Sequence, residues 1–322
     1  MQRQSQRPDP GAEIQQAEIE SAVARSGYPL EIRLLEAFEA AGMGPQIGTL
    51  TRPADTTHPK ERVPTREIDI VARLSHRLPL GERDAIYTSL SLTVAAKNLA
   101  PSAAMVGFKW KAVPSRELQL LRGRIGGSPT TVFDGYPEAN ALACGEGGFS
   151  DAFEPLSRAP ICVQWAIARR DDAMEQEKRY WRDLDVLVRA EWTNAVADSH
   201  AYLGSRSPVK LLHFQLPVLV VATKALYVCS ALENKLDQID WFTLRRTFDL
   251  GDRADERLVD IVTESGLPKF IEACKQTMAG ITEVVTKHSA EIVTLATTQH
   301  AKYLREMQEA ALDVAVSAQR GY

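Results

Sequence analysis

Two short stretches, REIDIVARL at residues 66–74 and LSLTVAAK at residues 90–97, decide the fold. Apolar side chains recur at every second residue in both, which is the period of a β-strand whose two faces have different surroundings. The even-numbered residues form the apolar face of each strand, whereas the odd-numbered residues include Asp69 and Lys97. An aspartate in mid-strand is disfavoured by β-propensity, so Asp69 is a candidate functional residue.

The rest of the chain mixes strand and helix patterns. Residues 46–52 and 240–248 also have the period of strands, and the apolar run LPVLVVA at residues 216–222 predicts a buried strand with a partner at 227–230. Helical spacing predicts helices at residues 12–25, 29–41, 158–170 and 175–203, and the glycine-rich residues 121–153 predict loop. Strands interleaved with helices predict an α/β fold with a mixed central sheet flanked by helices.

Three segments are expected along the chain. Residues 1–14 predict a flexible tail, residues 15–250 an α/β domain, and residues 251–322 a C-terminal helical extension. Apolar residues of that extension, from Leu267 to Leu295, follow a four-three spacing that only His288 interrupts. Two interpretations remain open: a helix that packs on its own domain, and a helix for self-association or partner docking.

Composition excludes several classes of protein. The chain has 322 residues, 44% hydrophobic and 25% charged, which is typical of globular proteins and excludes a fibrous or wholly disordered chain. The formal charge of -4, from 38 basic and 42 acidic residues, argues against a protein coated in basic charge. The four cysteines have no metal-ligand spacing, and no apolar run is long enough to span a bilayer. We expect a cytoplasmic protein without membrane contact.

Three motifs carry a resemblance to a known family. A carboxylate at Glu31 in the helix 29–41, the strand aspartate Asp69 and the strand lysine Lys97 resemble the PD-(D/E)xK nuclease superfamily, which has the restriction-endonuclease-like fold. The matching segments are SGYPLE (26–31), REIDIVA (66–72) and LTVAAK (92–97), and the resemblance covers about residues 26–111. It implies a restriction-endonuclease-like core and a glutamine on a following helix, for which Gln164 is the candidate.

The resemblance also implies a chemistry. Asp69, an acid at position 95, the backbone oxygen of Ala96 and Glu31 would hold Mg²⁺ or Mn²⁺, since hard oxygen ligands suit these ions. The metal would polarise a DNA phosphate and activate water, and Lys97 would orient that water or stabilise developing charge. The implied reaction is hydrolysis of DNA phosphodiester bonds.

Position 95 departs from the family pattern, because it is Ala95 where the family has Glu or Asp. An alanine side chain cannot bind a cation. Three explanations are open: a degenerate nuclease, an acid that has moved elsewhere, such as Glu67, or an engineered alanine in place of a glutamate. We favour the engineered change, because Glu31, Asp69 and Lys97 are all present.

Partners follow from charge and from the resemblance. Four basic residues that follow the second strand are candidates for binding along a DNA backbone. They are Lys109, Lys111, Arg122 and Arg124. A solvated charged surface would explain the same run. The family implies a gated setting, such as a restriction or anti-phage defence assembly in which the C-terminal helix joins chains or partners. The alternative function is a naturally inactive module that binds nucleic acid or protein.

Overall fold

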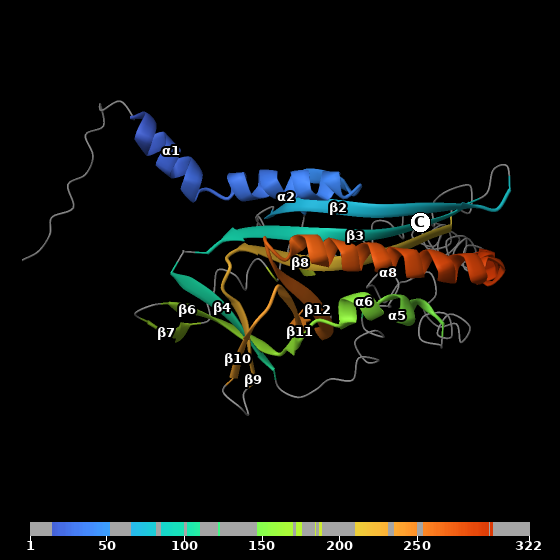
Figure 1. Ribbon diagram of the computed structural model, residues 1–322. Helices are drawn as coiled ribbons and strands as arrows, with labels where there is room; N and C mark the ends of the chain where they lie inside the picture. The colour runs from blue at the N-terminus through green and yellow to red at the C-terminus, as the bar shows by residue number, and fades with distance from the viewer. Residues whose placement is uncertain are drawn as a thin grey trace, which may run out of the picture.

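A computed structural model describes the residues that form the body of the protein. They are residues 15–51, 66–81, 85–99, 102–109, 122, 147–169, 172–175, 184, 187–188, 210–230, 235–249, 254–295 and 297–298. These residues form an α/β structure with a mixed seven-stranded sheet and a five-stranded sheet (Figure 1).

The larger sheet has the strand order β1-β2-β3-β8-β12-β11-β5. Its first three strands are antiparallel neighbours, and β8 then lies parallel to β3. The strands are β1 (Gly44–Thr51), β2 (Arg66–Pro79), β3 (Ala85–Asn98), β8 (Lys210–Ala222), β12 (Ala254–Thr263), β11 (Trp241–Asp249) and β5 (Ile161–Cys162). The strands predicted from alternation at 46–52, 66–74, 90–97, 216–222 and 240–248 are therefore confirmed.

The smaller sheet packs on one face of the larger one. Its order is β10 (Lys235–Gln238), β9 (Leu226–Ser230), β4 (Ala103–Lys109), β6 (Gln164–Arg169) and β7 (Asp172–Glu175). Trp165 and Met105 of this sheet share a buried apolar cluster with Leu219 and Ile261 of the larger sheet. The prediction that residues 227–230 pair with the strand 216–222 is wrong, because β9 pairs with β4 and β10.

Helices cover the opposite face of the larger sheet. They are α2 (Tyr28–Ala40), α5 (Phe149–Ala152), α6 (Glu154–Ser157) and α8 (Leu267–Lys287). Leu34 and Phe38 of α2 and Phe270 of α8 share one core with Leu92 of β3 and Val218 of β8. A further helix, α1 (Gln16–Arg25), continues beyond the start of α2 and away from the sheets (Figure 1).

The predicted helix at residues 158–170 is wrong. The structure has α6 ending at Ser157, followed by β5 and β6. Residues 163–168 read VQWAIA, a short apolar run whose period does not distinguish a buried strand from a buried helix. The next predicted helix, 175–203, begins in β7, and of its later residues the structure describes only Leu184, Leu187 and Val188, which are helical.

The C-terminal segment belongs to the same core as the rest. Strand β12 lies between β8 and β11, so the boundary predicted at residue 250 falls between paired strands. The apolar seam of α8 packs against the central sheet, as the first of the two interpretations expects. Residues 1–14 and those after 298 lie outside the described residues. None of the helices described is long and apolar enough to cross a membrane.

Candidate functional site

Asp69 and Lys97 come together where β2 and β3 end their pairing. Lys97 Nζ lies 3.8 Å from Asp69 Oδ2, and each side chain is 20% exposed. The same carboxylate oxygen accepts a hydrogen bond of 2.7 Å from the backbone N–H of Ala96. The strand aspartate and the strand lysine selected from the sequence thus form one polar pair at the end of two neighbouring strands.

The backbone at Ala96 also turns toward this pair. The N–H and C=O of one strand residue point to the same side of the strand, as they do when antiparallel residues exchange both bonds. Because the Ala96 N–H points at Asp69, its carbonyl oxygen also faces β2. Ile70 and Val94 are the last residues paired between β2 and β3, and continuing that register by one step would set position 95 opposite Asp69.

Ala95 itself lies in an apolar environment. Its side chain is 7% exposed and packs in the cluster between the two sheets, with Leu219 directly opposite on β8. Ser91 and Thr93 are polar and share that face of β3, but they are only 2% and 1% exposed. The structure does not describe the Glu67 side chain, so the alternative that Glu67 takes the role of the missing acid stays a prediction.

Glu31 approaches the same end of the sheet on helix α2. Asn98, next to Lys97, donates a hydrogen bond of 2.8 Å from Nδ2 to the backbone oxygen of Ser26, which joins the end of β3 to the start of α2. Glu31 Oε1 lies 2.9 Å from where a Cβ on Gly27 would stand, so the side chain folds back over the helix start. A negative charge is stabilised there by the helix dipole.

The residues present do not make up a metal site. No group of three or more His, Cys, Asp or Glu residues in the described part of the chain is placed to hold a metal ion. At the end of β2 and β3, the one oxygen of Asp69 with described contacts already meets the Ala96 N–H and Lys97. A second carboxylate facing Asp69, the part that Ala95 lacks, is what a divalent cation would need here.

Gln164 does not lie on a helix. It begins β6 in the smaller sheet, where it is exposed and pairs with Phe108 of β4. Its predicted role rested on the helix 158–170, so the structure removes the reason for placing it beside Asp69.

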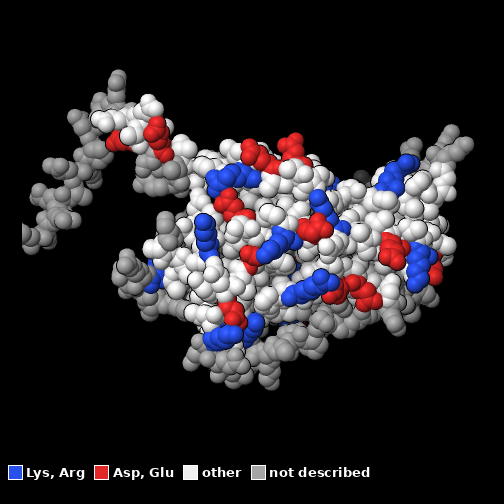
Figure 2. All heavy atoms as spheres, viewed as in Figure 1, with Lys and Arg blue, Asp and Glu red and all other residues white. Residues whose placement is uncertain are grey.

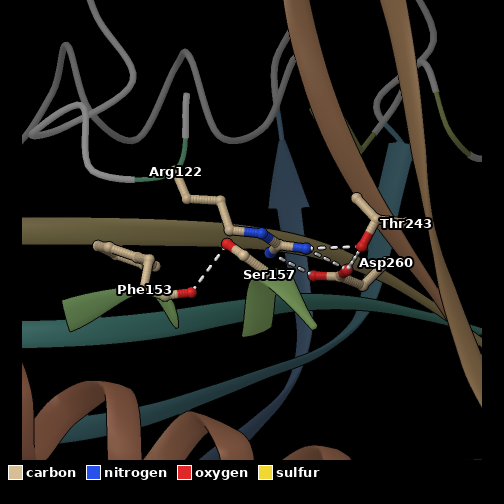
Figure 3. Close-up of polar contacts among 5 residues, drawn as sticks. All are labelled: Arg122, Phe153, Ser157, Thr243 and Asp260. Carbon is tan, nitrogen blue, oxygen red and sulfur yellow. Dashed lines mark hydrogen bonds and ion pairs between the residues drawn. The ribbon is translucent and has the colours of Figure 1, made fainter. Parts of the chain in front are cut away.

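Arg122 is not a surface residue for DNA. Its guanidinium is buried against Asp260 of β12 and Thr243 of β11 (Figure 3), with ion-pair side chains 2% and 1% exposed. Lys109 ends β4 in the smaller sheet and is partly buried. Lys111 and Arg124 lie outside the described residues.

The sequence analysis assigned no role to two arginines on β2. Arg73 and Arg77 are exposed and, by strand alternation, lie on the same side of β2 as Asp69. The alternation over residues 66–74 already includes Arg73, and extending it beyond residue 74 would have added Arg77 to the same face. The face of the molecule that carries α8, by contrast, shows basic and acidic side chains interspersed (Figure 2).

Comparisons with protein-family models, with curated proteins and with solved structures give no match to this chain.

Proposed function

We propose that this chain has the core of a PD-(D/E)xK nuclease, a metal-dependent DNA endonuclease, held inactive by Ala95. The observation that carries the proposal is the contact between Asp69 and Lys97. The register of β2 and β3, continued by one step, would set position 95 opposite Asp69. Two further features support it. The Ala96 backbone turns toward Asp69, and helix α2 brings Glu31 to the same end of the sheet.

Restoring an acid at position 95 would complete a metal site. Directly opposite residues of an antiparallel pair have Cβ atoms about 5 Å apart, so an introduced carboxylate and that of Asp69 would face each other across a gap that suits one cation. A bound Mg²⁺ would supply a Lewis acid for the scissile phosphate. Lys97, partly exposed and 3.8 Å from Asp69, would hold the attacking water.

A second function has its own supporting observation. Ala95 is buried in an apolar cluster that also contains Leu219, Leu99 and Met105, an environment that suits an alanine native to that position. This favours a naturally inactive module that binds nucleic acid or protein through the same fold. For the nuclease, a defence assembly that gates activity is the setting that the resemblance suggests.

The experiment compares Ala95→Glu with the isosteric Ala95→Gln on supercoiled plasmid DNA. We expect cutting by Ala95→Glu alone, with Mg²⁺ or Mn²⁺ and not with EDTA. Adding Lys97→Met to Ala95→Glu should lower the rate by about 100-fold or more, a typical loss for one positioned catalytic group. Circular dichroism checks that each variant is folded. A folded Ala95→Glu protein that cuts no DNA would contradict the nuclease proposal and leave the binding module.

A further inference from the structure

Two exposed arginines on β2 are held in fixed positions by uncharged partners. Arg73 Nε donates to Ser91 Oγ at 3.0 Å, and Arg77 Nε donates to the Tyr87 hydroxyl at 3.2 Å. Each partner lies directly opposite its arginine on β3. The Arg77 guanidinium also lies 5.8 Å from the centre of the Tyr87 ring, a cation–π distance. These contacts orient both guanidinium groups without neutralising them.

Other arginines of the protein have carboxylate partners. The arginines paired in this way are Arg33 with Glu264, Arg122 with Asp260, Arg158 with Glu154 and Arg245 with Glu256. Within the part of the chain that the structure describes, neither Arg73 nor Arg77 forms an ion pair. Their positive charge is therefore available to an anion from outside.

The two arginines are in line with the candidate site. The pairing of β2 with β3 is unbroken from Ile70 to Pro79, so side chains of β2 alternate regularly and Arg73 and Arg77 share the face of Asp69. At about 3.3 Å per residue, Arg73 lies about 13 Å and Arg77 about 26 Å from Asp69 along the strand. Duplex DNA rises 3.4 Å per base pair, so these distances correspond to about four and eight base pairs.

This end of β2 is also accessible as a sheet edge. Strand β1 pairs with β2 only as far as Arg73, opposite Gly44, while β2 continues to Pro79. Beyond Arg73, β2 has β3 as its neighbour and no described strand on its other side. Tyr87 is 40% exposed there. A rod-shaped polyanion could therefore lie along this row without displacing any of the strands that the structure describes.

We infer that a row of side chains binds the phosphate backbone of duplex DNA that runs along β2 toward Asp69 and Lys97. This β2 arginine row consists of Arg73 and Arg77, together with Tyr87 of β3. The DNA-binding role stands on the uncompensated charge and the exposed edge, and the direction toward Asp69 rests on the proposed nuclease function. Phosphate contacts of this kind come from arginine and from hydroxyl side chains, and they carry affinity rather than sequence preference.

Binding of a fluorescent 20-base-pair duplex by the full chain with its own Ala95 tests the inference. Anisotropy is measured for the unaltered protein and for Arg73→Gln/Arg77→Gln between 50 and 200 mM salt. Loss of two phosphate contacts should weaken binding about ten-fold and make the slope of log K against log[salt] shallower by about 1.8. Lys235→Gln/Lys275→Gln, which removes two exposed lysines on β10 and α8, should bind as the unaltered protein does.

Several outcomes separate the possibilities. Unchanged affinity and slope in the arginine variant, or no duplex binding by the unaltered protein at 50 mM salt, would overturn the inference. Equal affinity for poly-glutamate would also overturn it, because that would indicate an acidic protein as the partner. If Arg73→Gln/Arg77→Gln weakens binding while Ala95→Glu cuts no DNA, the binding row stands and the nuclease proposal fails.

Discussion

Arg122 donates a hydrogen bond to each oxygen of Asp260, at 2.7 and 2.6 Å, from a position 138 residues earlier in the chain. Thr243 completes the arrangement, because its hydroxyl accepts from Arg122 at 2.8 Å and donates to Asp260 at 2.8 Å (Figure 3). Both ionic side chains are almost fully buried. The pair fastens the chain at Arg122 to two strands of the central sheet, β11 and β12.

Replacing Arg122 by methionine should be strongly destabilising. The change leaves the Asp260 carboxylate buried without its cation, and breaking one partner of a buried pair costs about 3–5 kcal/mol. Urea denaturation followed by circular dichroism measures the free energy of unfolding. The control is Arg158→Met, which breaks the exposed pair with Glu154 and should cause a far smaller loss. Equal losses in the two variants would contradict a special role for the buried pair.

The Arg122 contact shows where local sequence reasoning reaches its limit. Arg122 lies in a basic stretch, and the local pattern indicated a solvent-facing cation. Its partners Thr243 and Asp260 come from strands that meet it only in the folded chain. By contrast, the strands around Asp69 and Lys97 depend on alternation over eight or nine residues, which is why both strands were predictable. The expectation that the two residues share one site came from the family resemblance.

The environment of Ala95 could not be predicted for a related reason. Alternation places Ala95 on the face of Asp69 and Lys97, and that part of the prediction agrees with the register. The second sheet that covers this face includes β6, which the sequence analysis assigned to a helix. Without that strand, the sequence analysis lacked Trp165, one of the residues of the apolar cluster that contains Ala95.

Gly107 of β4 should not tolerate a side chain. A Cβ there would lie 2.6 Å from Cys162 Sγ and 3.0 Å from Phe242 Cζ, both between the sheets. Gly107→Ala should therefore lower the free energy of unfolding by about 1–3 kcal/mol, the usual cost of overpacking. Gly44→Ala is the matched control, since nothing lies within 4 Å of its Cβ position. Similar stabilities of the two variants would show that the sheets separate easily at Gly107.

Cys162 should make the protein lose stability in alkaline solution. Burial raises the pKa of its thiol from 9.0 to about 12, while the nearby charge of Lys109 acts in the opposite direction. Below pH 9 the thiol is protonated in both folded and unfolded chains, so its contribution is complete. Above pH 9 the unfolded chain releases this proton first, and stability falls by about 1.4 kcal/mol per pH unit until the folded thiol also ionises.

Thermal or urea unfolding of Cys162→Ala isolates this effect. The difference in unfolding free energy between the variant and the unaltered protein should be constant from pH 7 to 8.5. It should then shift in favour of the variant by about 2 kcal/mol by pH 10.5. A difference that stays constant over the whole range would mean that the thiol is reached by water.

Removing α8 should prevent folding rather than change the number of chains per particle. Its buried residues, among them Phe270, Ile271 and Ile281, cover one face of the central sheet. A chain that ends after Ser265 exposes that face, so we expect loss of the cooperative unfolding transition and rapid proteolysis. A chain that begins at Ser26, without α1, is the comparison, because α1 lies outside the main core. A folded chain ending at Ser265 would restore the interpretation of a separate extension.

Metal-linked stability provides a test of the site that does not depend on cutting. In EDTA, Ala95→Glu should be less stable than Ala95→Gln, because the introduced charge enters a buried position that the continued register sets opposite the carboxylate of Asp69. Mg²⁺ should then stabilise Ala95→Glu selectively, by about 2.7 kcal/mol when its concentration is 100 times the dissociation constant. Differential scanning calorimetry of both variants with and without Mg²⁺ measures this.

Adding Asp69→Asn to Ala95→Glu should abolish the response to Mg²⁺, since only one of the two carboxylates would then remain. If Mg²⁺ stabilised both Ala95 variants equally, the cation would bind elsewhere, and Asp69 would have to be regarded as a structural partner of the Ala96 N–H and Lys97.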